Sequence, residues 1–346
     1  MALSNHTADQ DRRFSSAFAI LEQAIVDRAF PSASIAVVYR NQLIARRAFG
    51  RHTFDDASTP ASVDTIYDLA SVSKVVVTTT MAAILHERGL LDLDVKVPDR
   101  ADLNIRSLLT HTSGLPAHIK FYETTRDRDE LIRLAHGTPL VAAPGEKTEY
   151  SDVGFIILGE VLEQIAGEPL DQFAQREIFS PLQLQHTCFN PPRSVWPTIP
   201  PTRDDHHFRH RVIQGEVNDE NAAAMNGIAP HAGVFSTATE VAQFAECWLS
   251  GGAPILKPQT VHTFTRKQPG TDRALGWDRP TPPSTSGQYF SPSSFGHIGY
   301  TGTCLWCDPE KKLAVVTLTN RTWPNADNRA IRQVWPRFHD AIVESL

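Results

Sequence analysis

The segment from Leu69 to Leu85, LASVSKVVVTTTMAAIL, restricts most strongly how this chain can fold. It contains six consecutive β-branched residues, Val75–Thr80, and branching at Cβ stiffens the side chain and favours a strand. The apolar pattern nevertheless continues through MAAIL to Gly89, a natural helix terminator, so we predict a helix over 71–88. Such a helix must be packed on all sides, because only tertiary burial overrides its poor helix propensity.

Length, composition and charge are those of a globular protein. The chain has 346 residues, of which 41% are apolar and 21% are charged, so it can bury one large core or two closely joined ones. The net charge of -6 and the lack of basic blocks exclude nucleic acid as an expected partner. No apolar stretch has the length of a membrane span or a secretory signal, so we expect a cytoplasmic protein without membrane contact. The sequence does not indicate an oligomeric state.

The order of the predicted elements indicates one sheet that is assembled from both ends of the chain, with helices inserted between them. Residues 191–220 look like a long irregular connection, and a tight turn is expected at Asn41-Gln42. We expect helices at 12–29, 71–88, 102–111, 128–136, 152–166, 169–178 and 326–344, another helix ending at Gly251, and strands in 34–40, 43–50, 296–309 and 313–320.

Two polar residues at the front of the apolar segment are candidates for chemistry. Ser71 and Lys74 are three residues apart, so on a helix their side chains share a face and can meet. A serine at a helix N-terminus lies where developing negative charge is favoured. A lysine between apolar walls loses hydration, which lowers its pKa and makes it a plausible proton acceptor. Ser71 would then be a nucleophile that Lys74 helps to deprotonate, whereas the alternative interpretation is a helix cap beside a solvated lysine.

Two later segments strengthen the catalytic interpretation. Tyr150 and Asp152 stand two residues apart just ahead of an apolar helix, so both can point the same way in an extended turn. His297 and Gly299 open the late strand in FGHIGYTGT. Because glycine allows a close backbone approach, the following N–H, that of Tyr300, can face a ligand.

These three segments resemble the motifs of the penicillin-recognising serine hydrolases. The motifs are Ser71-Val72-Ser73-Lys74, Tyr150-Ser151-Asp152 and His297-Ile298-Gly299, and the similarity extends over nearly the whole chain. The chain is most similar to class C β-lactamases, D-alanyl-D-alanine carboxypeptidases and carboxylesterases of β-lactamase type. This resemblance implies an α+β, β-lactamase/transpeptidase-like fold, with an antiparallel sheet flanked by helices beside a mostly helical domain.

The resemblance also implies where the site lies and what each residue does. The sheet domain would comprise 1–70 and 226–346, and the helical domain 71–225, with the active site between them. Ser71 would be the nucleophile that forms an acyl-enzyme, and Lys74 and Tyr150 would share the general-base work. The backbone N–H groups of Ser71 and Tyr300 would form the oxyanion hole.

Two positions depart from the β-lactamase pattern and bear on the substrate. Asp152 replaces an asparagine, and a carboxylate near Lys74 should raise the lysine pKa and leave more of the base role to Tyr150. His297 replaces a lysine that supplies a fixed positive charge, whereas histidine is largely neutral at pH 7. We therefore expect a carboxylesterase on small neutral acyl esters, with Asp152, His297 and Gly299 contributing to the substrate site.

The alternatives are a D,D-peptidase or β-lactamase that acts on peptidoglycan fragments or lactams, and a non-catalytic ligand-binding relative. The absence of a G-x-S-x-G sequence disfavours an α/β-hydrolase esterase. No cofactor or metal is expected. Cys304 and Cys307 form a C-x-x-C that we interpret as strand packing rather than a redox or zinc site. His206, His207 and His210 lie in an irregular loop without a scaffold for a metal.

Overall fold

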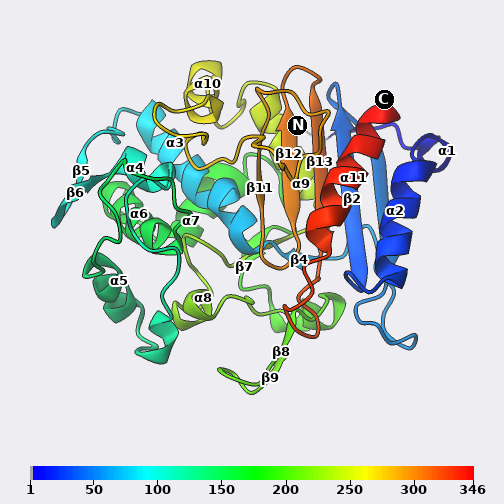
Figure 1. Ribbon diagram of the computed structural model, residues 1–346, viewed down its shortest axis with the longest axis horizontal. Coiled ribbons are helices and arrows are strands. Elements are labelled where there is room, and N and C mark those ends of the chain that lie inside the picture. The colour runs from blue at the N-terminus through cyan, green and yellow to red at the C-terminus, as the bar shows by residue number, and fades with distance from the viewer. Residues whose placement is uncertain (1–2) are drawn as a thin grey trace.

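A six-stranded sheet forms the centre of one half of the molecule. The computed structural model describes residues 3–346, and the strands follow the order β1-β3-β2-β13-β12-β11 (Figure 1). All neighbouring strands are antiparallel except β1 and β3. The predicted sheet from both ends of the chain is therefore confirmed. Its strands are β1 Ser4–Asn5, β2 Ser32–Tyr39, β3 Gln42–Gly50, β11 Phe295–Ile298, β12 Cys304–Asp308 and β13 Leu313–Thr319.

The two faces of this sheet belong to different cores, because successive side chains in a strand point to opposite faces. Ile35 and Val37 of β2 pack with α2 (Ser15–Val26) and α11 (Ile331–Glu344), while Ala36 and Val38 join a larger core that includes α9 (Ala238–Leu249). Figure 1 shows α2 and α11 in front of the sheet and α9 behind it. The sheet is thus covered on both faces, as the α+β assignment requires.

Helices dominate the other half of the molecule (Figure 1). They pack around the larger core, to which α6 contributes Val153, Phe155 and Leu158. The domain boundaries at residues 70 and 226 stay a prediction, since this core continues into the sheet. The helices are α3 Thr80–Glu87, α4 Ile105–Leu109, α5 Arg128–His136, α6 Asp152–Ala166, α7 Leu170–Ala174 and α8 Glu220–Ala224; short strands here and nearby are β4 Tyr67–Asp68, β5 Lys96–Val97, β6 Arg100–Asn104, β7 Cys188–Phe189, β8 Arg203–Asp205, β9 Arg211–Ile213 and β10 Val234–Ser236.

The apolar segment that follows Leu69 is helical, but it is not one regular α-helix. A 3-10 turn, η1 (Ala70–Val72), is followed by a wider π-helical stretch, η2 (Lys74–Thr79), and then by α3. The Thr80 hydroxyl donates to the Val75 carbonyl, five residues earlier, at 2.7 Å. The β-branched run is therefore accommodated by a widened helix, a local form that recurs at functional sites.

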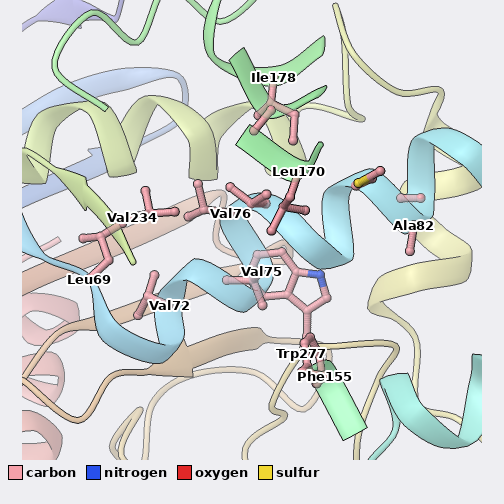
Figure 2. Packing of buried hydrophobic residues seen from close by; sticks show 14 of the residues in the cluster. Leu69, Val72, Val75, Val76, Ala82, Phe155, Leu170, Ile178, Val234 and Trp277 are labelled. Carbon is pink, nitrogen blue, oxygen red and sulfur yellow. The ribbon is translucent and has the colours of Figure 1, made fainter. Parts of the chain in front are cut away.

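Tertiary burial stabilises this unusual helix. Every residue from Val72 to Leu85 is buried. In Figure 2, Val75 and Val76 lie among side chains from α6, α7, β10 and the segment containing Trp277. The prediction that the segment is packed on all sides is confirmed.

Several predicted boundaries were wrong. The first predicted helix is interrupted at Phe14 into α1 (Gln10–Arg13) and α2, and Val26, placed on its apolar face, is 73% exposed. The turn after β2 uses Arg40 and Asn41, both with positive φ, rather than Asn41-Gln42.

The helix expected at 102–111 begins at Ile105, where Asn104 and Ser107 form a capping box, and the last helix begins at Ile331. The sequence analysis missed α10 (Pro258–Thr265) altogether.

Cys304 and Cys307 are both buried on β12, and they belong to the cores on opposite faces of the sheet. The strand-packing interpretation is therefore confirmed, because residues three apart in a strand point in opposite directions. Within residues 3–346, every helix is either too short or too polar to serve as a membrane span.

We expect Leu85→Ala to lower the free energy of unfolding by about 2–5 kcal/mol, because it leaves a cavity in the larger core. Leu85 is 1% exposed, whereas Leu90, five residues later, is 57% exposed. Leu90→Ala is thus a matched control that should change stability by less than about 0.5 kcal/mol. Urea denaturation measures both variants, and similar losses would contradict this account of the core.

Candidate active site

Ser71 lies in η1, directly after a strained residue. Ala70 has a φ of +45°, in the left-handed region that costs energy for a residue with a Cβ. The Ala70 N–H donates to the side chain of Asp68 at 2.8 Å, and Asp68 also accepts from the Asn218 N–H at 2.6 Å. Burial raises the pKa of Asp68 to about 6, although these two donors oppose the effect. Hydrogen bonds to this buried carboxyl therefore hold the sharp bend before Ser71.

The loop after β11 docks against the same bend. Thr301 and Thr303 donate their hydroxyls to the carbonyls of Asp68 and Leu69 at 2.8 and 2.7 Å. A Cβ on Gly299 would lie 2.5 Å from the Leu69 carbonyl oxygen, so only glycine permits this approach. The third sequence motif is thereby brought beside the first. Within residues 3–346, neither the Ser71 N–H nor the Tyr300 N–H has a hydrogen-bond acceptor, as an oxyanion hole requires.

Lys74 is completely buried and donates to three different acceptors. Its Nζ lies 3.0 Å from Ser71 Oγ, 2.7 Å from Asp152 Oδ1 and 3.1 Å from the carbonyl oxygen of His231. An ammonium has three N–H donors, so each acceptor takes one. Burial lowers the pKa of Lys74, but the charge of Asp152 and the nearby Tyr150 outweigh this effect and raise it overall. Lys74 is therefore an ammonium that donates to Ser71.

Asp152 is the first residue of α6, and the segment 111–118 positions it. Its N–H donates to the Ala117 carbonyl at 2.8 Å, and Ser151, the N-cap residue, donates to the Pro116 carbonyl at 2.7 Å. Burial raises the pKa of Asp152, but Lys74, together with His118 and His231, more than reverses this and holds that pKa below its usual value. The second oxygen, Oδ2, lies 3.6 Å from His118 Nδ1. The expectation that Asp152 raises the pKa of Lys74 is borne out.

Tyr150 is enclosed by nitrogen-bearing groups. The distance from the centre of the Tyr150 ring is 4.8 Å to Lys74 Nζ and 5.7 Å to the guanidinium carbon of Arg273. The centres of the His111 and His297 rings lie 4.5 and 5.9 Å from the centre of the Tyr150 ring. Burial raises the pKa of Tyr150, and although Lys74 and Ser71 lower it, the phenol keeps its proton at neutral pH. Tyr150 is thus a neutral phenol close to both Ser71 and the Lys74 ammonium.

His297 is buried and uncharged. Its Nδ1 lies 2.8 Å from the Ile298 carbonyl, so Nδ1 carries the proton and Nε2, which has no partner within residues 3–346, is an acceptor. Burial lowers the pKa of His297 to about 4. The sequence-based expectation of a neutral histidine is therefore met.

Five contributors to the site were not predicted from the sequence. His111 accepts the Ser151 N–H at 2.9 Å through Nδ1. Asp219 contacts His231 Nε2 at 2.9 Å and so holds the residue whose carbonyl accepts from Lys74. His118 and Arg273 were also missed. His111 belongs to the sequence HTSG, and His118 lies seven residues later, so their closeness to a recognisable motif could have indicated both as site residues. No comparable sequence signal indicated Arg273.

Two hollows lie away from Ser71. One of about 1000 Å³ is formed by α5, α6 and residues 225–228, and another of about 480 Å³ is lined by Tyr122, Phe208 and Glu220. Neither is lined by Ser71, Lys74 or Tyr150. In the part of the chain described, no group of three or more His, Cys, Asp or Glu side chains is arranged to hold a metal ion.

Comparisons with known proteins agree with this geometry. The beta-lactamase family model matches residues 18–335. A protein of Escherichia coli (strain K12), provisionally named a D-alanyl-D-alanine carboxypeptidase, is 32% identical over 346 aligned positions, which cover 86% of this chain and 80% of that protein.

Solved structures share the fold. EstCE1, described as a hydrolase with promiscuous acyltransferase activity, superposes with a TM-score of 0.79 at 21% identity, covering 97% of this chain and all of the other (100%). The octameric penicillin-binding protein homologue from Pyrococcus abyssi gives a TM-score of 0.75 at 20% identity, covering 95% of this chain and 77% of the other. The fold is that of β-lactamases and penicillin-binding proteins, and the chain belongs to the beta-lactamase family.

Proposed function

We propose that this protein is a serine hydrolase that forms an acyl-enzyme on Ser71 and cleaves small neutral acyl esters. The observation that carries the proposal is the contact of Ser71 Oγ with the buried ammonium of Lys74, at 3.0 Å. A hydroxyl held this way, next to a phenol and two unused backbone donors, is equipped for attack on a carbonyl.

Tyr150 is the group best suited to move the Ser71 proton, because Lys74 already uses its three N–H groups as donors. As a neutral phenol, Tyr150 accepts the serine proton on its oxygen and passes its own proton to the departing alkoxide. The Lys74 ammonium stabilises negative charge on either oxygen during this transfer. The Ser71 and Tyr300 N–H groups bind the oxyanion, and one such donor contributes about 3–4 kcal/mol in comparable enzymes.

The charge balance around Ser71 favours neutral substrates. Lys74 is paired with Asp152 and Arg273 with Asp278, while His297 is uncharged. A substrate carboxylate would therefore meet no cation that lacks an anionic partner among these residues. The hydrolase activity in the name of EstCE1 is in line with this proposal.

A second candidate is a D,D-carboxypeptidase activity. It is favoured by the name of the Escherichia coli relative and by the position of Arg273 beside Tyr150, where it could exchange Asp278 for a peptide carboxylate. Release of D-alanine from an acyl-D-alanyl-D-alanine peptide at a rate above that of p-nitrophenyl butyrate hydrolysis would establish this candidate in place of the esterase.

We expect Ser71→Ala to abolish turnover of p-nitrophenyl acetate and butyrate, because the proposed acyl-enzyme forms on the Ser71 hydroxyl. Ser250→Ala, which changes an exposed serine at the end of α9, should leave turnover unchanged. A covalent phosphonate should modify Ser71, as seen by peptide mass spectrometry. Full activity of Ser71→Ala would refute the assignment.

We expect Asp152→Asn to shift the alkaline limit of activity to lower pH. Asp152 holds the pKa of Lys74 above its usual value, so the native ammonium persists throughout the neutral and moderately alkaline range. Without that carboxylate, burial dominates and lowers the pKa of Lys74, and the variant should lose activity as Lys74 becomes neutral. The pH dependence of kcat/KM between pH 6 and 10 measures this, and superimposable profiles would contradict it.

A further inference from the structure

His118 shares the carboxylate that neutralises Lys74. Asp152 presents Oδ1 to Lys74 Nζ at 2.7 Å and Oδ2 to His118 Nδ1 at 3.6 Å. Exposure rises along this chain of groups: the side chain of Lys74 is 0% exposed, that of Asp152 17% and that of His118 37%. His118 is therefore the member of the network that reaches solvent.

Lys74 and Tyr150 hold their protons at rest, and His297, which presents an unprotonated Nε2, is a weak base because burial lowers its pKa to about 4. Lys74 donates all three of its N–H groups, and Tyr150 is a neutral phenol whose oxygen is a weak base. During acylation the departing alkoxide draws a proton from Tyr150 and so assists it. During hydrolysis of the acyl-enzyme, the departing oxygen is Ser71 Oγ, which already contacts an ammonium at 3.0 Å. Attack by water at that stage requires a base of its own.

We propose that His118, oriented by Asp152, accepts the proton of the water that hydrolyses the acyl-enzyme. This inference rests on the proposed function, since it concerns the second half of that reaction. Asp152 Oδ2 lies 3.6 Å from Nδ1, an ion-pair distance, and its negative charge favours the proton on that nitrogen, which leaves the Nε2 lone pair available. A neutral imidazole is a stronger proton acceptor than the neutral phenol of Tyr150.

The charged groups that face His118 strengthen it as a base. They are Asp152 at the start of α6 and Asp219 and Glu220 at the start of α8. Contact with Asp152 raises the pKa of His118, burial opposes this, and the other two carboxylates add to the increase. The free-base fraction therefore grows as pH rises through a value above 6.5, and hydrolysis of the acyl-enzyme should accelerate over the same range.

The step is balanced without an additional reactant. The water oxygen bonds to the acyl carbon, one water proton passes to His118 Nε2, and the carbonyl electron pair moves to the oxyanion. Collapse of that intermediate restores the carbonyl and breaks the bond between the acyl carbon and Ser71 Oγ. The serine then takes a proton from the Lys74–Tyr150 pair. His118 releases its proton to solvent and the pair regains one, so the acyl-enzyme and water give a carboxylic acid and free enzyme.

The test is the pre-steady-state turnover of p-nitrophenyl acetate by His118→Ala. We expect the burst of about one nitrophenol per enzyme to remain, because acylation does not use His118. The steady-state rate should fall about 10²- to 10⁴-fold, the usual contribution of a general base. Mass spectrometry should find the acetyl group accumulated on Ser71, and added imidazole should restore part of the steady-state rate.

A second variant and a control separate this role from a structural one. His118→Gln keeps a donor toward Asp152 but cannot act as this base, so it should behave like His118→Ala, whereas wild-type turnover in this variant would overturn the proposal. His206→Ala removes another exposed histidine beside an aspartate, Asp204 at 3.4 Å, and should leave both phases unchanged. Thermal denaturation should show that all three variants are folded.

The outcomes also distinguish this inference from the proposed function. If Ser71→Ala turns over ester normally, the acyl-enzyme itself is refuted, whatever His118 does. The base role of His118 is refuted, while the esterase proposal stands, in either of two cases in which an adduct still forms on Ser71. In the first, His118→Ala keeps the wild-type steady-state rate. In the second, His118→Ala loses both the burst and the steady-state rate, and imidazole restores neither.

Discussion

The buried ammonium of Lys74 is the interaction on which the rest of the site depends. Transfer of a charge into an apolar interior is unfavourable by several kcal/mol unless it is paired and fully hydrogen-bonded. Asp152, the His231 carbonyl and Ser71 meet that requirement, and each comes from a different part of the chain. The pairing also raises the pKa of Lys74, so the group that contacts Ser71 is an ammonium at neutral pH. Stability and reactivity therefore share one set of contacts.

Hydrogen bonds to main-chain groups hold the catalytic segments together. Asp68 constrains the bend before Ser71 through the Ala70 N–H, and two threonines of the β11–β12 loop bind the carbonyls of Asp68 and Leu69. On the opposite side, segment 111–118 binds both Ser151 and Asp152. These supports lie on the sheet side and the helical side of Ser71, so displacement of either part would separate the Tyr300 N–H from the Lys74 ammonium. The site is consequently a property of the whole fold.

The sequence predicted the elements whose periodicity and caps are local. Helices α5 and α6 begin and end where expected, because Asp127 and Ser151 cap them and their apolar spacing is regular. The segment after Leu69 was predicted as a helix, but its π-helical stretch was not, since that stretch depends on how the β-branched side chains pack against distant segments. The predicted helices at 12–29 and 102–111 had wrong boundaries, because the first is interrupted at Phe14 and the second begins after the capping box at Asn104. In both regions several local signals overlap, and tertiary packing decides which of them ends or begins the helix.

The sequence by itself determined the family, the sheet built from both ends of the chain, and the order of the three motifs. These follow from residue types and spacings, which can be recognised without knowing any tertiary contact. Together with the family resemblance, the sequence also predicted a carboxylate near Lys74 and a neutral His297. Only the tertiary structure decided how deeply these groups are buried and which other charges face them, and a pKa depends on both. It buried Lys74 completely against Asp152, 78 residues away, placed His118 3.6 Å from the other oxygen of that carboxylate, and buried His297, which lowers its pKa to about 4.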